Sequence, residues 1–181
     1  TASWDEVYKI IKSKIMTTNK DKIAGFVGDL SSMEASFAFK EFFERIIDVN
    51  NYDFRSSNNF IDNSNRENYL FNSTINGIEN SDLIFLIGTN PRFEATILNA
   101  RIRKAHLENN PKIISLNDVG DLTYPYEFLN GSSKTIKEIF DGTNKFSNEI
   151  INAKRPLIIL GESFLNLKSA KFLFFKIKNF L

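Results

Sequence analysis

Apolar residues recur at helical spacing at the start of the chain and gather into short apolar stretches further along it. The first pattern predicts an amphipathic helix, and its members are Trp4, Val7, Tyr8, Ile11 and Ile15. Residues 23–27 form a short apolar stretch before Gly28, which predicts a buried strand and a turn. Ser31 and Glu34 have the spacing of a capping box, so we expect a helix from there to about residue 47.

The order of strand, glycine turn and helix returns in the middle of the chain. Residues 83–87 (LIFLI) are all apolar and predict a strand, and Gly88 follows them as the turn residue. Asn90 suits the cap of the next helix and Pro91 suits its first position. Glu94 then lies in the first turn, where the helix dipole favours a negative charge.

Two further apolar stretches, residues 112–116 and 157–160, predict strands that are separated by helices. Strands that are almost wholly apolar and alternate with helices favour a parallel sheet covered on both faces. We therefore predict an α/β fold with a Rossmann-like, mostly parallel sheet and helices on both faces. We expect a single domain over residues 1–181, with the polar stretch 50–68 as a long loop and its weakest point.

The composition excludes several kinds of chemistry. The 181 residues include no cysteine, so this chain forms no disulfide, thiolate metal site or cysteine-held iron–sulfur cluster. His106 is the only histidine, which excludes a metal site of several imidazoles. The net charge of +1 implies neither a nucleic-acid groove nor a polybasic membrane patch. No apolar run approaches the roughly 20 residues of a membrane span. We expect no catalytic residue and no metal ligand.

The most site-like segment is 83–92, with the sequence LIFLIGTNPR. A strand that runs into a glycine turn and a helix N-terminus presents backbone N–H groups to an anion. Open α/β sheets bind ligands at the carboxyl ends of such strands. One interpretation is a phosphate site for a nucleotide or a pterin at Gly88, Thr89 and Asn90, and the other is a plain strand-to-helix connection. The pattern favours the connection, because the full dinucleotide fingerprint is absent.

Three other features have structural explanations that we favour over functional ones. Gly25 and Gly28 repeat the glycine signal in a weaker form that is common in tight packing. His106 lies late in a predicted helix, where a lone histidine is usually a surface residue. The tail 172–181 is apolar with interleaved lysines and is compatible with a membrane-surface helix. We interpret it as a packing element or a partner contact, since exposed phenylalanines would favour aggregation.

Several stretches resemble one known family. They are similar to the molybdopterin-oxidoreductase-like region of the large iron–sulfur (75-kDa, G-type) subunit of NADH:ubiquinone oxidoreductase, respiratory complex I. The match is almost residue for residue in GTNPRFEATILNARIRK, residues 88–104. The segments IAGFVGDLSSMEASFAFKEFF, DLTYPYEFL and RPLIILGES resemble further parts of that region, so the resemblance covers most of the chain.

The resemblance implies a domain that shares its fold with molybdopterin enzymes but holds no cofactor. The iron–sulfur clusters and the FMN are then expected in other chains or in the iron–sulfur part of the same subunit. The turn Gly88, Thr89 and Asn90 would be a vestigial site. The residues that we expect to fix the fold or to form an interface are Pro91, Arg92, Glu94, Asn99, Arg101 and Arg103. This chain is shorter than the family's usual later part, so we expect a fragment, a split subunit or a reduced version.

The resemblance also implies a setting and partners. We expect the chain to support electron transfer from NADH to ubiquinone in the peripheral arm of the proton-pumping enzyme without carrying a redox centre itself. Its partners would be other peripheral-arm subunits, above all the iron–sulfur part of the same subunit type, and neither nucleic acid nor a membrane span. Its place would be the matrix side of the mitochondrial inner membrane, or the cytoplasmic face of a bacterial inner membrane.

Two alternatives stay open. The first is a pterin- or nucleotide-binding oxidoreductase fragment with its ligand at the turn from Gly88 to Asn90. The second is a free-standing nucleotide-binding module with a Rossmann-like sheet, which the imperfect glycine pattern disfavours.

Overall fold

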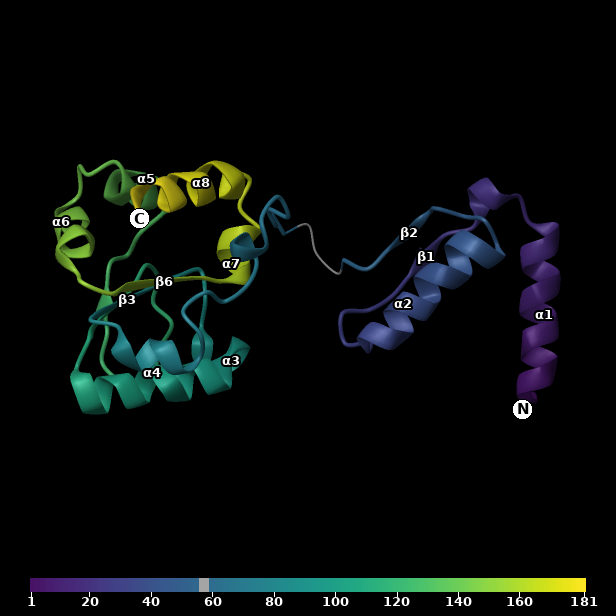
Figure 1. The fold of residues 1–181 in the computed structure, drawn as a ribbon, viewed down its shortest axis with the longest axis horizontal. Coiled ribbons are helices and arrows are strands. Elements are labelled where there is room, and N and C mark those ends of the chain that lie inside the picture. The colour runs from purple at the N-terminus through teal and green to yellow at the C-terminus, as the bar shows by residue number, and fades with distance from the viewer. Residues whose placement is uncertain (56–58) are drawn as a thin grey trace. The chain divides into compact units, whose positions relative to one another are not determined.

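The computed structural model describes residues 1–55 and 59–181 (Figure 1). Contacts within the chain divide it into two compact units, Thr1–Asn58 and Asn59–Leu181. The division falls inside the stretch 50–68, whose many Asn and Ser residues are typical of a boundary between compact units. The expectation that residues 1–181 act together as one domain stays a prediction.

Unit 1 is small and mostly helical. It contains α1 (Trp4–Thr17), the 3-10 turn η1 (Lys20–Lys22), β1 (Gly25–Phe26), α2 (Met33–Glu41), the π-helix η2 (Phe42–Ile46) and β2 (Tyr52–Asp53). The amphipathic first helix is confirmed, and a capping box between Ser3 and Glu6 starts it. The second helix begins one residue later than predicted, because Ser32 caps it and Ser31 does not. The predicted strand at 23–27 shrinks to two residues, which pair in parallel with β2.

An aromatic cluster explains one of the two glycines in this unit. The rings of Phe39 and Phe43 stack with their centroids 4.5 Å apart. A Cβ on Gly25 would overlap the ring atoms of both phenylalanines. Gly25 therefore lets β1 lie against these rings, and the packing interpretation is confirmed for it.

Unit 2 holds the main sheet. Its elements are η3 (Arg66–Asn68), η4 (Asn76–Asn80), β3 (Leu83–Ile87), α3 (Pro91–Glu94), α4 (Thr96–Asn109), β4 (Lys112–Ser115), β5 (Glu127–Phe128), α5 (Ser133–Phe140), α6 (Lys145–Asn152), β6 (Pro156–Leu160), α7 (Glu162–Leu165) and α8 (Ala170–Phe180). The four strands lie in the order β5-β4-β3-β6, and every neighbouring pair is parallel. The predicted α/β class with a parallel sheet is confirmed.

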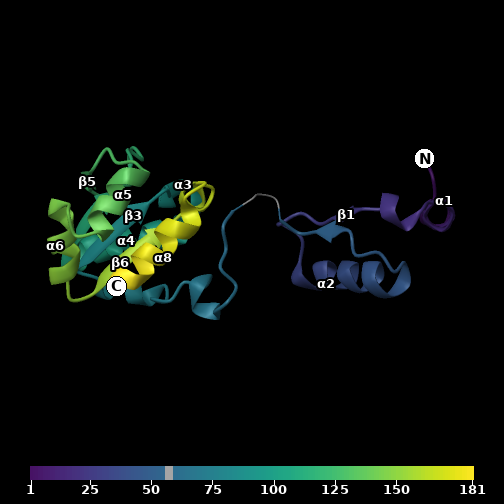
Figure 2. The same cartoon turned by 90° about the horizontal axis from the view of Figure 1, so that it is seen from above.

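The sheet is covered on both faces, as Figures 1 and 2 show. All five residues of β3 are buried, and successive side chains point to opposite faces. Phe85 belongs to the core under α5, α6, α7 and α8, whereas Ile84 belongs to the core under η4 and α4. The strand therefore lies at the centre of both cores, which explains why its sequence is continuously apolar.

The tail forms helix α8, and its apolar face is used for packing. Leu173 and Ile177 are buried in the same core as Phe140 of α5. The ring of Phe180 meets that of Phe140 edge to face, with the centroids 5.3 Å apart. The interpretation of the tail as a packing element is confirmed.

Candidate functional site

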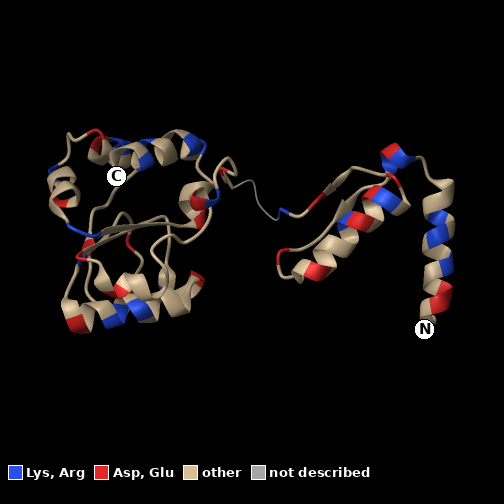
Figure 3. Cartoon of the chain, viewed as in Figure 1, with Lys and Arg blue, Asp and Glu red and all other residues tan. Residues whose placement is uncertain are grey.

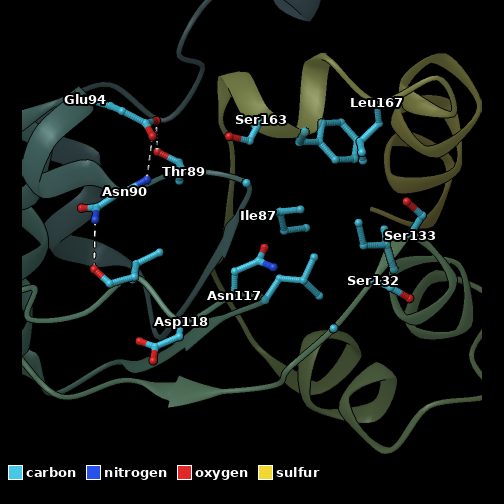
Figure 4. Close-up of a pocket in the computed structure, with 16 residues that line it drawn as sticks. Ile87, Thr89, Asn90, Glu94, Asn117, Asp118, Ser132, Ser133, Ser163 and Leu167 are labelled. Atoms are coloured by element: carbon cyan, nitrogen blue, oxygen red, sulfur yellow. Dashed lines mark hydrogen bonds between the residues drawn. The ribbon is translucent and has the colours of Figure 1, made fainter.

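A cleft of about 600 Å³ lies at the carboxyl ends of the strands in unit 2 (Figure 4). Its walls come from the turn after β3, the segment after β4, the start of α5, and α7. Ile87 and Leu167 supply apolar surface, while Asn117 and Ser133 supply polar groups. The position is the one at which open parallel sheets bind ligands.

The glycine turn after β3 is shaped by the neighbouring turn after β6. Gly88 has a φ of 65°, in the left-handed region that favours glycine. A Cβ there would lie 2.5 Å from the backbone nitrogen of Phe164. Gly161 is equally restricted, because a Cβ on it would overlap Gly88 and Thr89. The two glycines therefore allow a close approach of the two backbones just beyond the ends of β3 and β6.

The hydrogen-bond donors of the glycine turn are already bound by the carboxylate of Glu94. Thr89 donates its hydroxyl to Oε2 of Glu94 at 2.8 Å, and the Asn90 backbone N–H donates to Oε1 at 3.0 Å. The side chain of Asn90 accepts from the Arg92 N–H at 3.2 Å and donates to the Val119 carbonyl at 2.9 Å. The positions at which an anion would bind are thus already held by the Glu94 carboxylate (Figure 4).

The helix that follows begins as predicted but is broken. Asn90 is its cap and the buried Pro91 is its first residue. Ala95 leaves the helical region with φ −150° and ψ 68°, so the predicted helix is divided into α3 and α4. Arg92 reaches from α3 to Asp121 and donates to its carbonyl at 2.6 Å and to its carboxylate at 2.7 Å. The Thr123 N–H and Arg92 together hold the pKa of Asp121 below its usual range.

Asn99 is buried, and both polar atoms of its side chain form hydrogen bonds. It is buried in α4, donates to the Leu122 carbonyl at 3.1 Å and accepts from the Tyr124 hydroxyl at 2.8 Å. Burial raises the pKa of Tyr124 well above its usual value, so the hydroxyl keeps its proton and donates. Asn99 therefore ties α4 to the segment after β4.

Arg101 is bound by a residue that the sequence pattern does not single out. It forms an ion pair with Glu79 of η4, and Lys104 binds the other carboxylate oxygen at 2.7 Å. Hydrogen bonds from Lys104 and Arg101 hold the pKa of Glu79 below its ordinary value of 4.5. The one sequence signal for this ion pair is the spacing of three between Arg101 and Lys104, which places both side chains on the same side of a helix. Arg103, by contrast, is exposed and pairs with none of the residues described at 1–55 and 59–181.

The remaining candidate residues add no chemistry to this cleft. His106 lies in the last turn of α4, and the cleft lining does not include it. Within residues 1–55 and 59–181, no group of three or more His, Cys, Asp or Glu side chains has an arrangement that suits a metal ion. In the same ranges no helix has the length and apolar character needed to cross a membrane.

The turn, the parallel sheet and the sequence together define the class of this protein. The family model for molybdopterin oxidoreductase matches residues 1–181, and the chain belongs to that family.

The chain is also similar in sequence to several named proteins. The chain is 39% identical over 162 residues to the G subunit of NADH-quinone oxidoreductase from Rickettsia bellii and 37% identical over 161 residues to that from Rickettsia felis. The G subunit from Rickettsia prowazekii is 38% identical over 160 residues. These alignments include 88–90% of this chain but only 24% of each relative, so the chain spans about a quarter of their length.

Proposed function

We propose that this chain is a supporting domain of the large iron–sulfur subunit of a proton-pumping NADH:quinone oxidoreductase, and that it binds no cofactor of its own. The support for the assembly is the likeness to three proteins named as the G subunit of that enzyme along about nine tenths of the chain. The single observation in favour of a cofactor-free role is the carboxylate of Glu94 on the donors of the turn.

The family name implies a molybdopterin, and the residues at the turn do not fit its phosphate. A phosphate at Thr89 and Asn90 would meet the Glu94 carboxylate at the position of its own oxygens, and two anions there repel each other. The approach of Phe164 to Gly88 further narrows the space at the turn. The chain also lacks the cysteine that would give a thiolate ligand to a metal.

The role that follows is a mechanical one. The iron–sulfur clusters and the FMN belong to other chains or to the iron–sulfur part of the subunit, and this domain supports electron transfer from NADH to quinone by holding its neighbours. Its proposed partners are the other peripheral-arm subunits, and its net charge of +1 gives no reason to expect nucleic acid. The relatives are bacterial, which favours the cytoplasmic face of a bacterial inner membrane over the mitochondrial matrix side.

A second candidate is a pterin- or nucleotide-binding oxidoreductase fragment. The observation in its favour is the cleft of about 600 Å³, which lies where such ligands bind in open α/β sheets. In this alternative Glu94 would have to turn away from Thr89 and Asn90 to admit a phosphate.

One experiment tests both candidates. The complete protein that contains this chain is tagged in its host, its membranes are solubilised gently, and native gels are stained for NADH dehydrogenase activity. We expect the tag to migrate with the active band. The isolated protein is then denatured and extracted, and mass spectrometry searches the extract for pterins and nucleotides. A stoichiometric pterin in the extract, or a stoichiometric nucleotide other than FMN, would contradict the cofactor-free role, and a tag that migrates apart from the active band would contradict the assembly.

A further inference from the structure

The cleft at the carboxyl ends of the strands combines apolar surface with an acidic side. Its apolar residues are Ile87, Leu116, Ile136, Phe164 and Leu167. Its acidic residues are Glu94 and Asp118, which lie on one side of the cleft in Figure 4, across from Leu167 and Ser133. None of the residues that line this cleft, all of them in the described part of the chain, is Lys, Arg or His. A volume of about 600 Å³ is sufficient for a small ligand, so the cleft is an open cavity with a negative charge.

The carboxylate of Asp118 is fixed in place and has one oxygen to spare. Its Oδ1 accepts the Gly120 N–H at 3.0 Å and the Tyr126 hydroxyl at 2.9 Å. These two hydrogen bonds hold the pKa of Asp118 below its usual range, so the group is charged at neutral pH. Its Oδ2 accepts no hydrogen bond from the residues described at 1–55 and 59–181. Asp118 therefore presents a free acceptor to the cleft.

Asn90 connects the positions of the two acidic residues. Its backbone N–H donates to Oε1 of Glu94 at 3.0 Å, and its side-chain amide donates to the carbonyl of Val119 at 2.9 Å. Val119 is the next residue after Asp118. Two carboxylates are thus held on the same side of the cleft by one intervening residue.

The negative charge of this side is not neutralised by the chain. Neither Glu94 nor Asp118 forms an ion pair with a residue in the described ranges. Figure 3 shows basic segments along α4 and α8, and neither helix lines the cleft. Lys134 lies near the start of α5 but pairs with Glu138 at 3.7 Å, and Lys168 follows the lining segment without lining the cleft itself. A cation between the two carboxylates would relieve their repulsion, whereas a phosphate would add to it.

The start of α5, on the opposite side, is the one feature that favours a negative group. A helix dipole acts only within about the first turn, which here lies beside Ser132 and Ser133. The Ser132 N–H already donates to the hydroxyl of Thr135 at 3.0 Å. The serine side of the cleft therefore suits hydrogen-bond acceptors of a ligand, and the acidic side suits its cation.

From this arrangement we infer that the cleft binds a guanidinium or ammonium group that is carried on an apolar stem. The cation lies against Glu94 and Asp118, where charge-assisted hydrogen bonds form, and the stem covers the apolar surface of Ile87 and Leu167. The inference deepens the proposed function and rests on it for the identity of the neighbouring proteins. The group comes either from an Arg or Lys side chain of a neighbouring protein segment or from a free organic amine, and the two arms of the test distinguish these sources.

The first arm uses the complete protein in its host. A photo-crosslinking amino acid replaces Asn117, an exposed residue of the cleft lining, and in a control it replaces Phe172, which is 56% exposed on α8. If a protein supplies the cation, position 117 should label a segment that contains Arg or Lys, and position 172 should not. Asp118→Asn should reduce that yield at least about tenfold, because the amide keeps an acceptor for Gly120 but loses the charge. Glu108→Gln removes an exposed charge on α4 and should leave the yield unchanged.

The second arm applies if position 117 labels no protein segment. Equilibrium dialysis of the isolated complete protein then compares n-butylguanidinium with n-butyl phosphate. We expect the guanidinium to bind and the phosphate not to bind, and Asp118→Asn should weaken the guanidinium at least about tenfold. Circular dichroism of the variant distinguishes loss of the charge from loss of the fold.

The remaining outcomes overturn the inference. They are a labelled segment without Arg or Lys, a yield or affinity that Asp118→Asn leaves unchanged, binding of the phosphate as tight as that of the guanidinium, and the absence of both labelling and binding. The result is separate from that of the native gel. A basic segment that is labelled in a protein outside the NADH-oxidising band would retain the cation site and reject the proposed assembly.

Discussion

Glu94 binds back to the turn that precedes it. Its carboxylate accepts a hydrogen bond from the Thr89 hydroxyl at 2.8 Å and one from the Asn90 N–H at 3.0 Å. A site that would otherwise attract an anion is in this way satisfied from within. The same two hydrogen bonds therefore contribute to the stability of unit 2 and oppose the binding of an anion in the cleft.

Replacement of Glu94 by Ala should lower the free energy of unfolding by about 1 kcal/mol, because the hydroxyl of Thr89 and the N–H of Asn90 lose their acceptor. Urea unfolding followed by circular dichroism measures the change. Glu108→Ala is the control, since Glu108 forms a 3.8 Å pair with Lys104 on the exposed surface of the helix, where such a pair contributes little. Equal effects of the two substitutions would show that the Glu94 hydrogen bonds contribute nothing specific.

Gly88→Ala should destabilise the chain by at least about 2 kcal/mol, since an alanine there is strained by the positive φ and also strikes Phe164. Gly142→Ala separates the two causes, because Gly142 has a φ of 79° and no atom within 4 Å of the added Cβ. We expect that control to cost about 1 kcal/mol, which is the backbone strain alone. Thermal melts of both variants would contradict the close-approach argument if they coincide.

Tyr124→Phe should cost about 1–3 kcal/mol, because it leaves the buried Oδ1 of Asn99 without its donor. Tyr69→Phe removes a hydroxyl from a tyrosine that is 52% exposed and should change little. The difference between the two free energies of unfolding reports the buried hydrogen bond. A Tyr124→Phe protein as stable as the wild type would mean that water replaces the hydroxyl.

Asp82 should make unit 2 sensitive to acid. It accepts the backbone N–H of Lys154 at 2.7 Å and that of Arg155 at 2.9 Å, where the chain enters β6. Burial by itself raises the pKa of Asp82, but the hydrogen bonds from backbone N–H groups, those of Arg155 and Lys154 foremost, together outweigh it, so the pKa in the folded state lies below the ordinary value of 3.8.

The sign of the pH dependence follows from that shift. As the pH falls below about 5, the unfolded chain takes up a proton at Asp82 before the folded chain does, and the stability that this residue contributes is lost progressively. Above that pH the contribution is complete. Urea titrations from pH 7 to pH 3 should therefore give a shallower loss of stability for Asp82→Asn than for the wild type. Parallel curves would assign the acid sensitivity to other carboxylates.

Local signals in the sequence were sufficient for the elements around the cleft. The five apolar residues of β3, the turn at Gly88 and the start of α3 at Asn90 and Pro91 were all predicted, because each depends on neighbours within about five positions. The complete lack of cysteine likewise excluded thiolate chemistry without any structure.

What the sequence could not give are the partners of polar side chains. Glu79 meets Arg101 across 22 positions of the chain, and Tyr124 meets Asn99 across 25. No periodicity links such pairs, since they are brought together by the packing of η4 and of the segment after β4 onto α4. The break at Ala95 was missed for a related reason, because nothing in the helical pattern of residues 91–109 marks it.

The sequence by itself thus determined the class of fold, the strand at its centre and the kinds of chemistry that are absent, because those follow from residue types and short spacings. Only the tertiary structure decided that the chain forms two compact units, that Glu94 occupies the donors of the turn, and that Arg103 faces outward while Arg101 is paired. These depend on which surfaces meet in space, and the free energy that selects among such meetings belongs to the packed chain as a whole.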